Sequence, residues 1–207
     1  MKDTDQPLIL YEDNHFLLID KPPMWLTQPA GKGALNLEEW GKSSIRTNYL
    51  HAIHRLDKEV RGIVLFAKTS KALSRLNQSM REGAICKTYR AFCEEGSLQD
   101  EGVLDHFLEH TSHKSVVSTE RHGKRARLSY RVLERKQGTA LVEITLHTGR
   151  YHQIRSQFSI VGAPILGDKK YGSHMQFTGS GIALCHSTIL FPHPISKLPV
   201  AVHSSLL

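Results

Sequence analysis

The sequence predicts an α/β protein of the α+β type, built on a mixed, mostly antiparallel and bent sheet with a few flanking helices and loops. Strand-like apolar runs recur along the 207 residues, and only two or three segments have the spacing of an amphipathic helix. These helices do not alternate with the strands one by one, which disfavours a doubly wound parallel sheet. No linker-like stretch interrupts the pattern, so we expect a single domain over residues 8–203 after a short tail at 1–7.

Turn, cap and periodicity signals place the elements along the chain. Glu12-Asp13-Asn14 separates two apolar runs, which predicts an opening hairpin. Thr69 or Ser70 is suited to cap a helix that ends at Gly83, a residue typical of a left-handed C-cap. The expected strands cover 8–11, 15–20, 62–68, 87–94, 126–133, 139–147, 182–191 and 198–203, and the expected helices cover 35–44, 70–83 and 149–161.

Charge is the one departure from an ordinary composition. The chain has 27 Lys and Arg against 20 Asp and Glu, a net charge of +7, and eight basic side chains against two acidic ones lie in residues 114–136. This balance disfavours an acidic or disordered protein and favours a polyanionic partner such as RNA. A solvated flexible loop and an RNA-contacting loop or hairpin explain the basic segment equally well, and composition leaves both open.

Cysteine usage and hydropathy bear on the compartment. Cys86, Cys93 and Cys185 include no CxxC pair, and the sequence has neither a signal-peptide core nor an apolar run of membrane length. We therefore expect free buried thiols in a soluble, cytoplasmic and monomeric protein with no membrane partner.

Two segments carry residues suited to chemistry. Asp57 lies among cations in a loop that leads into a strand, where most aspartates are simply turn or cap residues. Arg155 lies at the edge of an apolar helix face, where it needs a carboxylate or phosphate partner unless its side chain reaches water. Phosphate-binding glycine loops, GxSxG elbows and metal-ligand spacings are all missing, so neither a nucleotide cofactor nor a metal is expected.

Four ordered segments together resemble one family. HRLDKEVRGIVLFAKTS resembles the signature H-R-L-D-x-x-[TS]-[SG]-G-x-x-L-x-A-K of the RluA-type pseudouridine synthases. LHTGRYHQIRSQFSIVGAPILGDKKYG is similar to their later blocks T-G-R-x-H-Q-I-R and P-I-x-G-D-x-x-Y-G. KTYRA and LLIDKPPMWLTQP are similar to K-x-Y-x-A and to the opening V-x-x-K-P-x-G. The order and spacing fit from about Leu8 to His203.

The resemblance implies an RNA pseudouridine synthase that acts on ribosomal or transfer RNA without a cofactor or a metal. It makes Asp57 the catalytic carboxylate, Arg155 its ion-pair partner and Tyr89 the residue against the target uracil. Arg55 would occupy the space that the flipped nucleotide leaves in the RNA. The other cations expected to contact RNA are Arg61, Lys71, Arg75, Lys124, Arg125, Arg127 and Arg150.

The reaction agrees with these residues. Pseudouridine formation breaks the N-glycosidic bond of uridine and rejoins the uracil through carbon, which requires no redox agent. An ionised carboxylate can act as a nucleophile at the sugar or as a base at its 2′ carbon, and an adjacent cation favours the ionised form. Tyr89 is suited to stack on the flipped base. The sequence leaves both roles of Asp57 open.

Some positions depart from the family pattern. Val60-Arg61 replaces a small, hydroxyl-bearing pair, Tyr151 replaces a common Thr, and Met24 lies where Gly is usual. These departures put rate and substrate choice in question. They leave a second hypothesis, a non-catalytic RNA-binding or assembly protein, and a weaker third one, a nucleoside or base hydrolase that uses Asp57. No N-terminal S4-type domain is expected, so recognition is assigned to loops of the catalytic domain.

Overall fold

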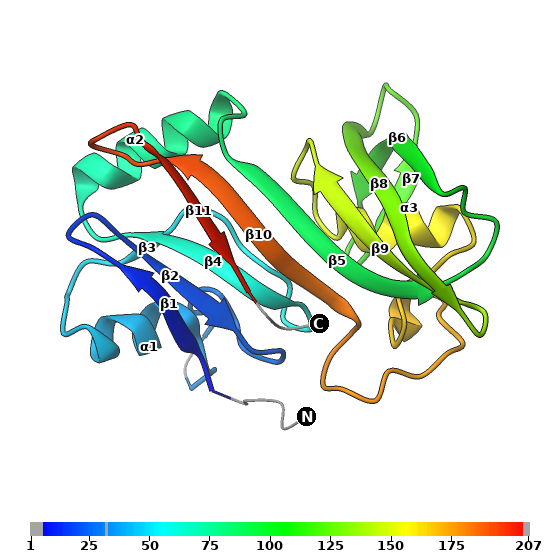
Figure 1. Cartoon of the computed structure of the whole chain (residues 1–207), viewed down its shortest axis with the longest axis horizontal. Helices are drawn as coiled ribbons and strands as arrows, with labels where there is room; N and C mark the ends of the chain where they lie inside the picture. Colours follow the sequence, from blue (N-terminus) through cyan, green and yellow to red (C-terminus); the bar gives the residue numbers. More distant parts are fainter. Residues whose placement is uncertain (1–5, 32, 205–207) are drawn as a thin grey trace. The chain divides into compact units, whose positions relative to one another are not determined.

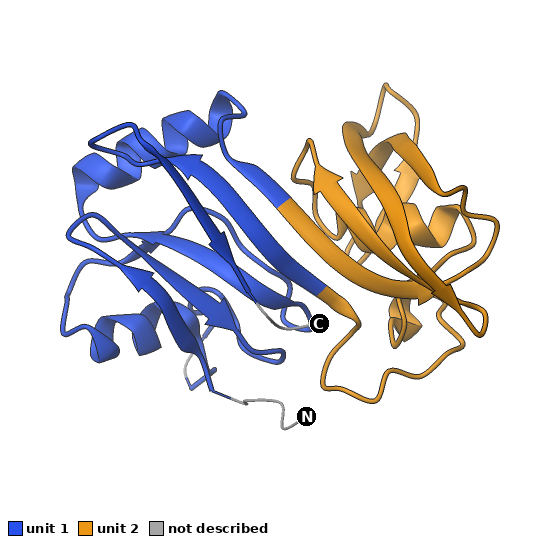
Figure 2. Ribbon diagram, in the orientation of Figure 1, with its two compact units in different colours: residues 1–87, 185–206 blue, residues 88–184, 207 orange. Residues whose placement is uncertain are grey.

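The computed structural model describes residues 6–31 and 33–204. The chain divides into two compact units, which Figure 2 shows in separate colours: unit 1 comprises Met1–Lys87 and Cys185–Leu206, and unit 2 comprises Thr88–Leu184 and Leu207. The described part contains three α-helices and eleven strands in a mixed, mostly antiparallel arrangement, which confirms the predicted fold class. A single domain over 8–203 stays a prediction, and residues 1–5 of the expected tail lie outside the described residues.

Unit 1 is built on strands in the order β1, β2, β4 and β10, with β3 paired to β4 and β11 paired to β10 (Figure 1). β4 and β10 run parallel, whereas the other pairs in this unit are antiparallel. Its strands are β1 (Leu8–Glu12), β2 (Phe16–Lys21), β3 (His51–Ala52), β4 (Arg61–Ala67), β10 (Leu184–Pro192) and β11 (Pro199–His203).

Two helices, α1 (Leu37–Ser44) and α2 (Ser70–Arg81), pack against this sheet. The Thr69 hydroxyl caps α2 by accepting the Ala72 N–H at 3.1 Å. The predicted apolar face is confirmed, because Ala72 and Leu76 are fully buried in the core cluster while Leu73 and Met80 pack against it half-buried. All seven residues of β4 are buried, so the strand that follows the Asp57 loop is held on both faces.

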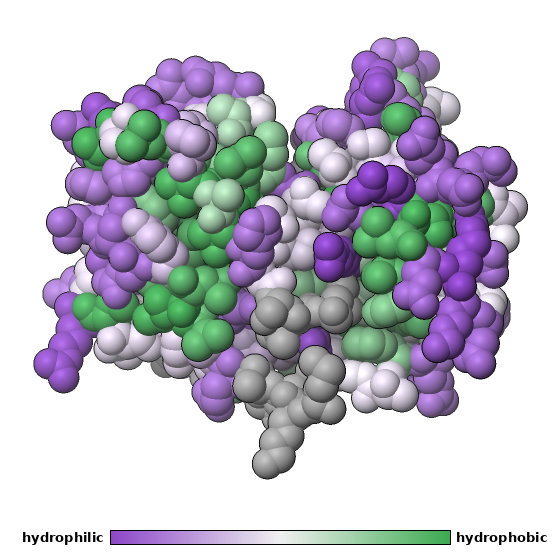
Figure 3. Space-filling view, viewed as in Figure 1, coloured by the Kyte–Doolittle hydropathy of each residue, from purple (hydrophilic) through white to green (hydrophobic). Residues whose placement is uncertain are grey.

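Unit 2 has its strands in the order β5, β9, β8, β6 and β7, and the pairs that β6 and β8 form are antiparallel. Its helical elements are α3 (Gln153–Ile160) and a 3-10 turn, η1 (Lys169–Tyr171). The strands are β5 (Cys86–Glu94), β6 (Glu101–His110), β7 (Ser115–Ser118), β8 (Lys124–Lys136) and β9 (Thr139–Leu146). Figure 3 shows that polar side chains surround smaller hydrophobic areas on the visible face of each unit.

The basic segment 114–136 is neither a loop nor a single hairpin. It forms β7 and β8, which both pair with β6. His106 and His110, whose spacing of four residues would also suit a helix, lie on strand β6. Along β8, Ala126 and Leu128 are fully buried while Arg125 and Arg127 are exposed. This period of two is typical of a strand with one solvated face, and it confirms the strand expected at 126–133, which extends over Lys124–Lys136 in the structure.

The third helix begins four residues later than predicted. His152 has φ 49° and ψ 29°, a left-handed conformation that turns the chain just before α3. Tyr151, which falls within the predicted helix 149–161, therefore lies outside the observed one and is 39% exposed. Arg155 lies within the helix and is only 2% exposed.

No helix in the described part is long and apolar enough to cross a bilayer. All three cysteines are free thiols. Cys93 and Cys185 are buried as predicted, but Cys86 is exposed, because it begins β5 where the strand faces solvent.

Candidate active site

Asp57 lies half-buried in the loop that joins β3 to β4. The Val60 N–H donates to the Asp57 carbonyl at 3.1 Å and closes a turn before the strand. Gly62 follows with φ 112°, and a Cβ at this position would overlap the backbone of His186 on β10. The motif glycine is therefore required by close packing, and it anchors the loop that presents Asp57.

Both neighbours of Asp57 are held by the segment that follows β2. The Thr27 hydroxyl accepts the N–H of Leu56 at 3.1 Å and donates to the carbonyl of Leu56 at 3.3 Å. The Lys58 carbonyl accepts the N–H of Met24 at 2.7 Å. Met24 adopts φ 69°, a left-handed conformation, which explains why glycine is usual here. The loop is thus fixed on each side of the carboxylate.

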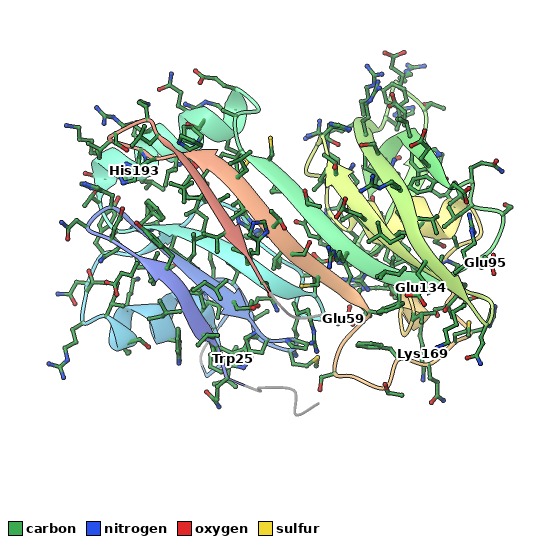
Figure 4. All side chains as sticks on the ribbon, viewed as in Figure 1. Trp25, Glu59, Glu95, Glu134, Lys169 and His193 are labelled. Atoms are coloured by element: carbon green, nitrogen blue, oxygen red, sulfur yellow. The ribbon has the colours of Figure 1, made fainter. Side chains whose placement is uncertain are left out.

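Lys21 is a fully buried cation in this arrangement. Its Nζ donates to the carbonyls of Pro22 at 3.0 Å, Trp25 at 2.8 Å and Lys58 at 3.1 Å; Trp25 is labelled in Figure 4. Burial lowers the pKa of Lys21 to about 7, and the charge of Asp57 opposes this shift. Three carbonyls match the three hydrogens of an ammonium group, so the charged form satisfies every acceptor. Lys21 joins the end of β2 to the Asp57 loop and interacts electrostatically with Asp57.

Arg61, predicted to contact RNA, is only 6% exposed. Burial raises the pKa of Asp20, while the nearby charges of Arg61 and Lys21 lower it. The first residue of β4 therefore provides charge inside unit 1 and has little exposed surface, and its contact with RNA stays a prediction. Val60, the other departure from the motif, is 3% exposed and belongs to the core.

In unit 2, Arg155 forms a buried ion pair with Asp168. Nε donates to Oδ2 at 2.6 Å and Nη2 donates to Oδ1 at 2.9 Å, and the two side chains are 2% and 1% exposed. The carboxylate partner that the sequence requires for Arg155 is thus present, and on this edge of the guanidinium it is Asp168. The predicted pair of Arg155 with Asp57 joins residues of different units and stays a prediction.

A histidine and a tyrosine hold the other side of Arg155. Nε2 of His152 lies 3.4 Å from Nη1 of Arg155, and Nδ1 of His152 lies 3.0 Å from the Tyr171 hydroxyl. Burial, followed by the charge of Arg155, lowers the pKa of His152 to about 3, so the ring is neutral near pH 7. Because arginine only donates, Nε2 accepts and Nδ1 carries the proton. The Tyr171 hydroxyl also accepts the Ser115 N–H at 2.8 Å, which joins β7 to this network.

Tyr89 lies on β5 and is 6% exposed. Its side chain shares the buried face of the strand with Ala91 and Cys93, whereas Arg90 is exposed on the opposite face. The part of β5 that carries Tyr89 belongs to unit 2 and Asp57 belongs to unit 1, so the placement of Tyr89 against the target base stays a prediction.

The other cations predicted to contact RNA differ in their surroundings. Arg75 is half-buried, and its Nη1 donates to the Pro194 carbonyl at 2.8 Å. The exposed ones are Arg55 and Lys71 in unit 1, and Lys124, Arg125, Arg127 and Arg150 in unit 2.

Two of these arginines share one acidic partner. Arg125 bonds both oxygens of Asp105, at 3.0 and 2.6 Å, and Arg127 lies 3.5 Å from the same carboxylate. The hydrogen bond from Arg125, before the charges of both arginines, keeps the pKa of Asp105 below its usual value. Arg150 donates from Nε to the Arg125 carbonyl at 2.9 Å. Asp105 thus neutralises part of the basic surface that residues 114–136 contribute.

A family model described as RNA pseudouridylate synthase matches residues 15–160. The chain belongs to this family. Both the Asp57 loop and the helix that carries Arg155 fall within the matched residues. Within the part of the chain that the structure describes, no group of three or more His, Cys, Asp or Glu side chains is arranged to hold a metal ion.

Curated relatives carry related names. The chain is 34% identical over 79% of its length to ribosomal large subunit pseudouridine synthase D of Nitrosomonas europaea, and spans 49% of that protein. It is 30% identical over 96% of its length to synthase C of Vibrio cholerae, and spans 65% of it. An uncharacterized RNA pseudouridine synthase of Zymomonas mobilis is 31% identical, with 96% of this chain and 93% of that protein covered.

Solved structures of synthases have the same fold. Human RNA pseudouridylate synthase domain containing 1 superposes with a TM-score of 0.82 at 20% identity, covering 98% of this chain and 84% of that one. Human RNA pseudouridylate synthase domain containing 4 superposes with a TM-score of 0.79 at 23% identity, covering 96% of this chain and 88% of that one. At these identities the likeness establishes the fold alone.

The sequence-based prediction of the synthase site missed Lys21, Thr27 and Asp168. The sequence contained a signal that Lys21 is unusual, since this lysine ends an apolar strand directly before two prolines. Asp168 lies in the GDKKYG block, but its spacing from Arg155 does not indicate a pair. Thr27 had no signal, because a hydroxyl that bonds backbone groups 29 residues away leaves no local pattern.

Proposed function

We propose that this chain is an RNA pseudouridine synthase that isomerises specific uridines in ribosomal or transfer RNA, with Asp57 as the catalytic carboxylate. The proposal is carried by the Asp57 loop, in which both neighbours of the carboxylate are hydrogen-bonded to the 22–27 segment. Such preorganisation is typical of a reacting group, because a displacement of about 1 Å can cost about 100-fold in rate. Membership of the synthase family gives the reaction class.

The proposed reaction is an isomerisation that needs no cofactor. The Asp57 carboxylate attacks C1′ of the uridine or removes the proton at C2′, and the bond from C1′ to N1 breaks with its electron pair on the uracil. The base rotates and C5 bonds to C1′. On the first route this bond displaces the carboxylate from C1′, and on the second the Asp57 carboxylic acid returns its proton to C2′, so either route restores the carboxylate. The C5 proton then leaves to water, and N1 takes up a proton. The positive charge of Lys21 favours the ionised form of Asp57.

Three further residues have proposed roles. Arg155 would pair with Asp57 through donors other than the two that it gives to Asp168. Tyr89 would stack on the flipped uracil, and Arg55, which is exposed, would fill the gap left in the RNA. Base flipping costs a few kcal/mol, which contacts of exposed cations with phosphates would offset.

The names of the relatives favour ribosomal RNA as the first substrate to test, with the chain acting as a cytoplasmic monomer. Purified protein is incubated with ribosomal and transfer RNA transcripts, and pseudouridine is mapped by mass spectrometry of nuclease fragments. Wild type is expected to modify defined uridines, and Asp57→Asn none. The control variant is Glu59→Gln, which removes a charge from the same loop and is expected to form pseudouridine like wild type; Glu59 is labelled in Figure 4.

The outcomes separate the competing hypotheses. Binding of RNA by wild type without any pseudouridine would support a non-catalytic RNA-binding protein, and release of free uracil would support a hydrolase. Equal loss in Asp57→Asn and Glu59→Gln would mean that the charge of the loop matters, and not the Asp57 carboxylate itself.

A further inference from the structure

Three aromatic rings form a ladder at the start of α3. The ring of Tyr151 stacks on that of His152, with centroids 3.8 Å apart and an interplanar angle of 18°. His110, at the end of β6, lies 4.1 Å from Tyr151 at 45°. His152 is 9% exposed, Tyr151 is 39% exposed and His110 is exposed. The ladder therefore extends from the buried Arg155 network to the surface of unit 2.

The outer rings of this ladder lie outside the buried core of unit 2. Tyr151 lies where the family motif commonly has Thr, and its ring is outside the core cluster of the helix. Its orientation is nevertheless fixed, because His152 beneath it is itself held by Tyr171 and Arg155. Tyr151 lies between His152 and His110, so His110 is the outermost ring of the ladder, and an exposed ring supported in this way can stack on a base at little entropic cost.

A cationic groove adjoins the ladder. It has a volume of about 460 Å³, and none of its lining residues is acidic. Lys114 Nζ lies 5.7 Å from the centroid of the Tyr171 ring, and Tyr171 in turn bonds His152. The polar residues that line it are Lys114, Ser115, Ser156, Ser159, Lys169 and Lys170; Lys169 is labelled in Figure 4.

Positive charge also lies next to Tyr151 in the sequence. Arg150 precedes it in the chain and is exposed, and its Nε donates to the carbonyl of Arg125. Cations near the ladder thus come from three places in the chain: Lys114 directly before β7, Arg150 in the turn before α3, and Lys169 and Lys170 in η1. Alternating flat rings and cations match the alternating bases and phosphates of a single-stranded nucleic acid.

We propose that His110 and Tyr151 form a stacking platform for an unpaired base of the RNA substrate, and that Lys114, Lys169 and Lys170 bind the adjoining phosphates. The inference rests on the proposed function for the identity of its ligand. It makes Tyr151 a specificity-determining residue of this chain, because a Thr at this position would provide no ring to support His110 against the base.

The test measures binding and needs no catalysis. The probes are a fluorescein-labelled oligouridine of about 12 nucleotides and a matched abasic ribose-phosphate oligomer of equal charge. Wild type is expected to bind oligouridine more tightly than the abasic oligomer. Tyr151→Thr and His110→Ala are expected to weaken binding of oligouridine by roughly 5- to 100-fold, without changing binding of the abasic oligomer or the salt dependence.

Two controls separate stacking from charge and from folding. Tyr151→Phe keeps the ring and is expected to bind oligouridine like wild type. The double variant K169Q/K170Q is expected to weaken binding of both oligomers and to reduce the slope of log K against log salt by about 0.7 per lost phosphate contact. Thermal unfolding of Tyr151→Thr is expected to match wild type.

Equal binding of the two oligomers by wild type, or equal loss for both in Tyr151→Thr, would overturn the platform. These outcomes are independent of pseudouridine formation. If ring-dependent binding is found in a protein that forms no pseudouridine, the platform stands and the proposed function fails. If pseudouridine forms but Tyr151→Thr binds oligouridine normally, the proposed function stands and the platform fails.

Discussion

The guanidinium of Arg155 bonds both carboxylate oxygens of Asp168 inside unit 2, at 2.6 and 2.9 Å. Water has almost no access to either side chain, so neither charge has another means of compensation at this edge. Two parallel N–H···O bonds also fix the plane of the guanidinium. Asp168 therefore determines where Arg155 presents its remaining donors. The sequence alone did not indicate this role of Asp168.

Removal of the Asp168 charge is expected to destabilise unit 2. Asp168→Asn keeps the shape but removes the counter-charge that bonds this edge of the buried guanidinium, so the free energy of unfolding should fall by about 3–5 kcal/mol. Urea denaturation followed by circular dichroism measures it. Asp105→Asn breaks the exposed pair with Arg125 and is the matched control, expected to cost less than about 1 kcal/mol. Similar costs for the two variants would contradict the structural role of Asp168.

Loss of the Thr27 hydroxyl is expected to slow catalysis by the proposed synthase. Thr27→Val removes both hydrogen bonds to Leu56, so the Asp57 loop loses its side-chain anchor at the residue before the carboxylate. We expect a loss of about 1–3 kcal/mol in stability and of roughly tenfold or more in kcat, measured as pseudouridine formed in single-turnover reactions. Thr27→Ser retains the hydroxyl and should stay within about twofold of wild type. Full activity of Thr27→Val would show that the anchor does not position Asp57.

Buried Lys21 is expected to make the protein more stable as the pH rises above neutral. Its pKa is lowered by burial from 10.5 to about 7, so between these values the unfolded chain binds more protons than the folded one. The free energy of unfolding therefore rises with pH in this window. Urea denaturation from pH 7 to 10 should show a smaller rise for Lys21→Met than for wild type. The exposed Lys71→Met is the control and should keep the slope of wild type.

Neutral buried histidines are expected to make the protein sensitive to acid. Burial lowers the pKa of His152 to about 3 and that of His186 to about 4, and that of His54 well below 6.5. Below pH 6.5 the unfolded chain thus binds more protons, and the free energy of unfolding falls as the pH drops toward 4.

A variant tests this acid sensitivity. His186→Asn should reduce the slope of stability against pH, between pH 5 and 6, by up to about 1.4 kcal/mol per pH unit. Urea denaturation at closely spaced pH values measures this slope. The control is His174→Asn, at an exposed histidine, which is expected to keep the slope of wild type. An unaltered slope in His186→Asn would show that His186 is not held neutral in the fold.

The fold followed from local patterns wherever these were strong. The turn at Glu12-Asp13-Asn14, the Thr69 cap and the apolar face of α2 lie within a few residues of the elements that they define, and each element was confirmed. The start of α3 was misplaced because the left-handed turn at His152 has no glycine to mark it. β6 was missed because acidic and histidine side chains interrupt its apolar residues, and β7 was missed because it has only four residues.

For the site, the sequence by itself determined that Asp57, Tyr89 and Arg155 belong to the motifs of a pseudouridine synthase, because ordered motifs are read along the chain. Only the tertiary structure decided which groups hold those motifs in place. Lys21 bonds the carbonyl of Lys58, Thr27 bonds Leu56, and Asp168 pairs with Arg155. Each bond joins residues 13 to 37 positions apart, where no periodicity relates one residue to the other, so these contacts are determined by packing and not by local sequence.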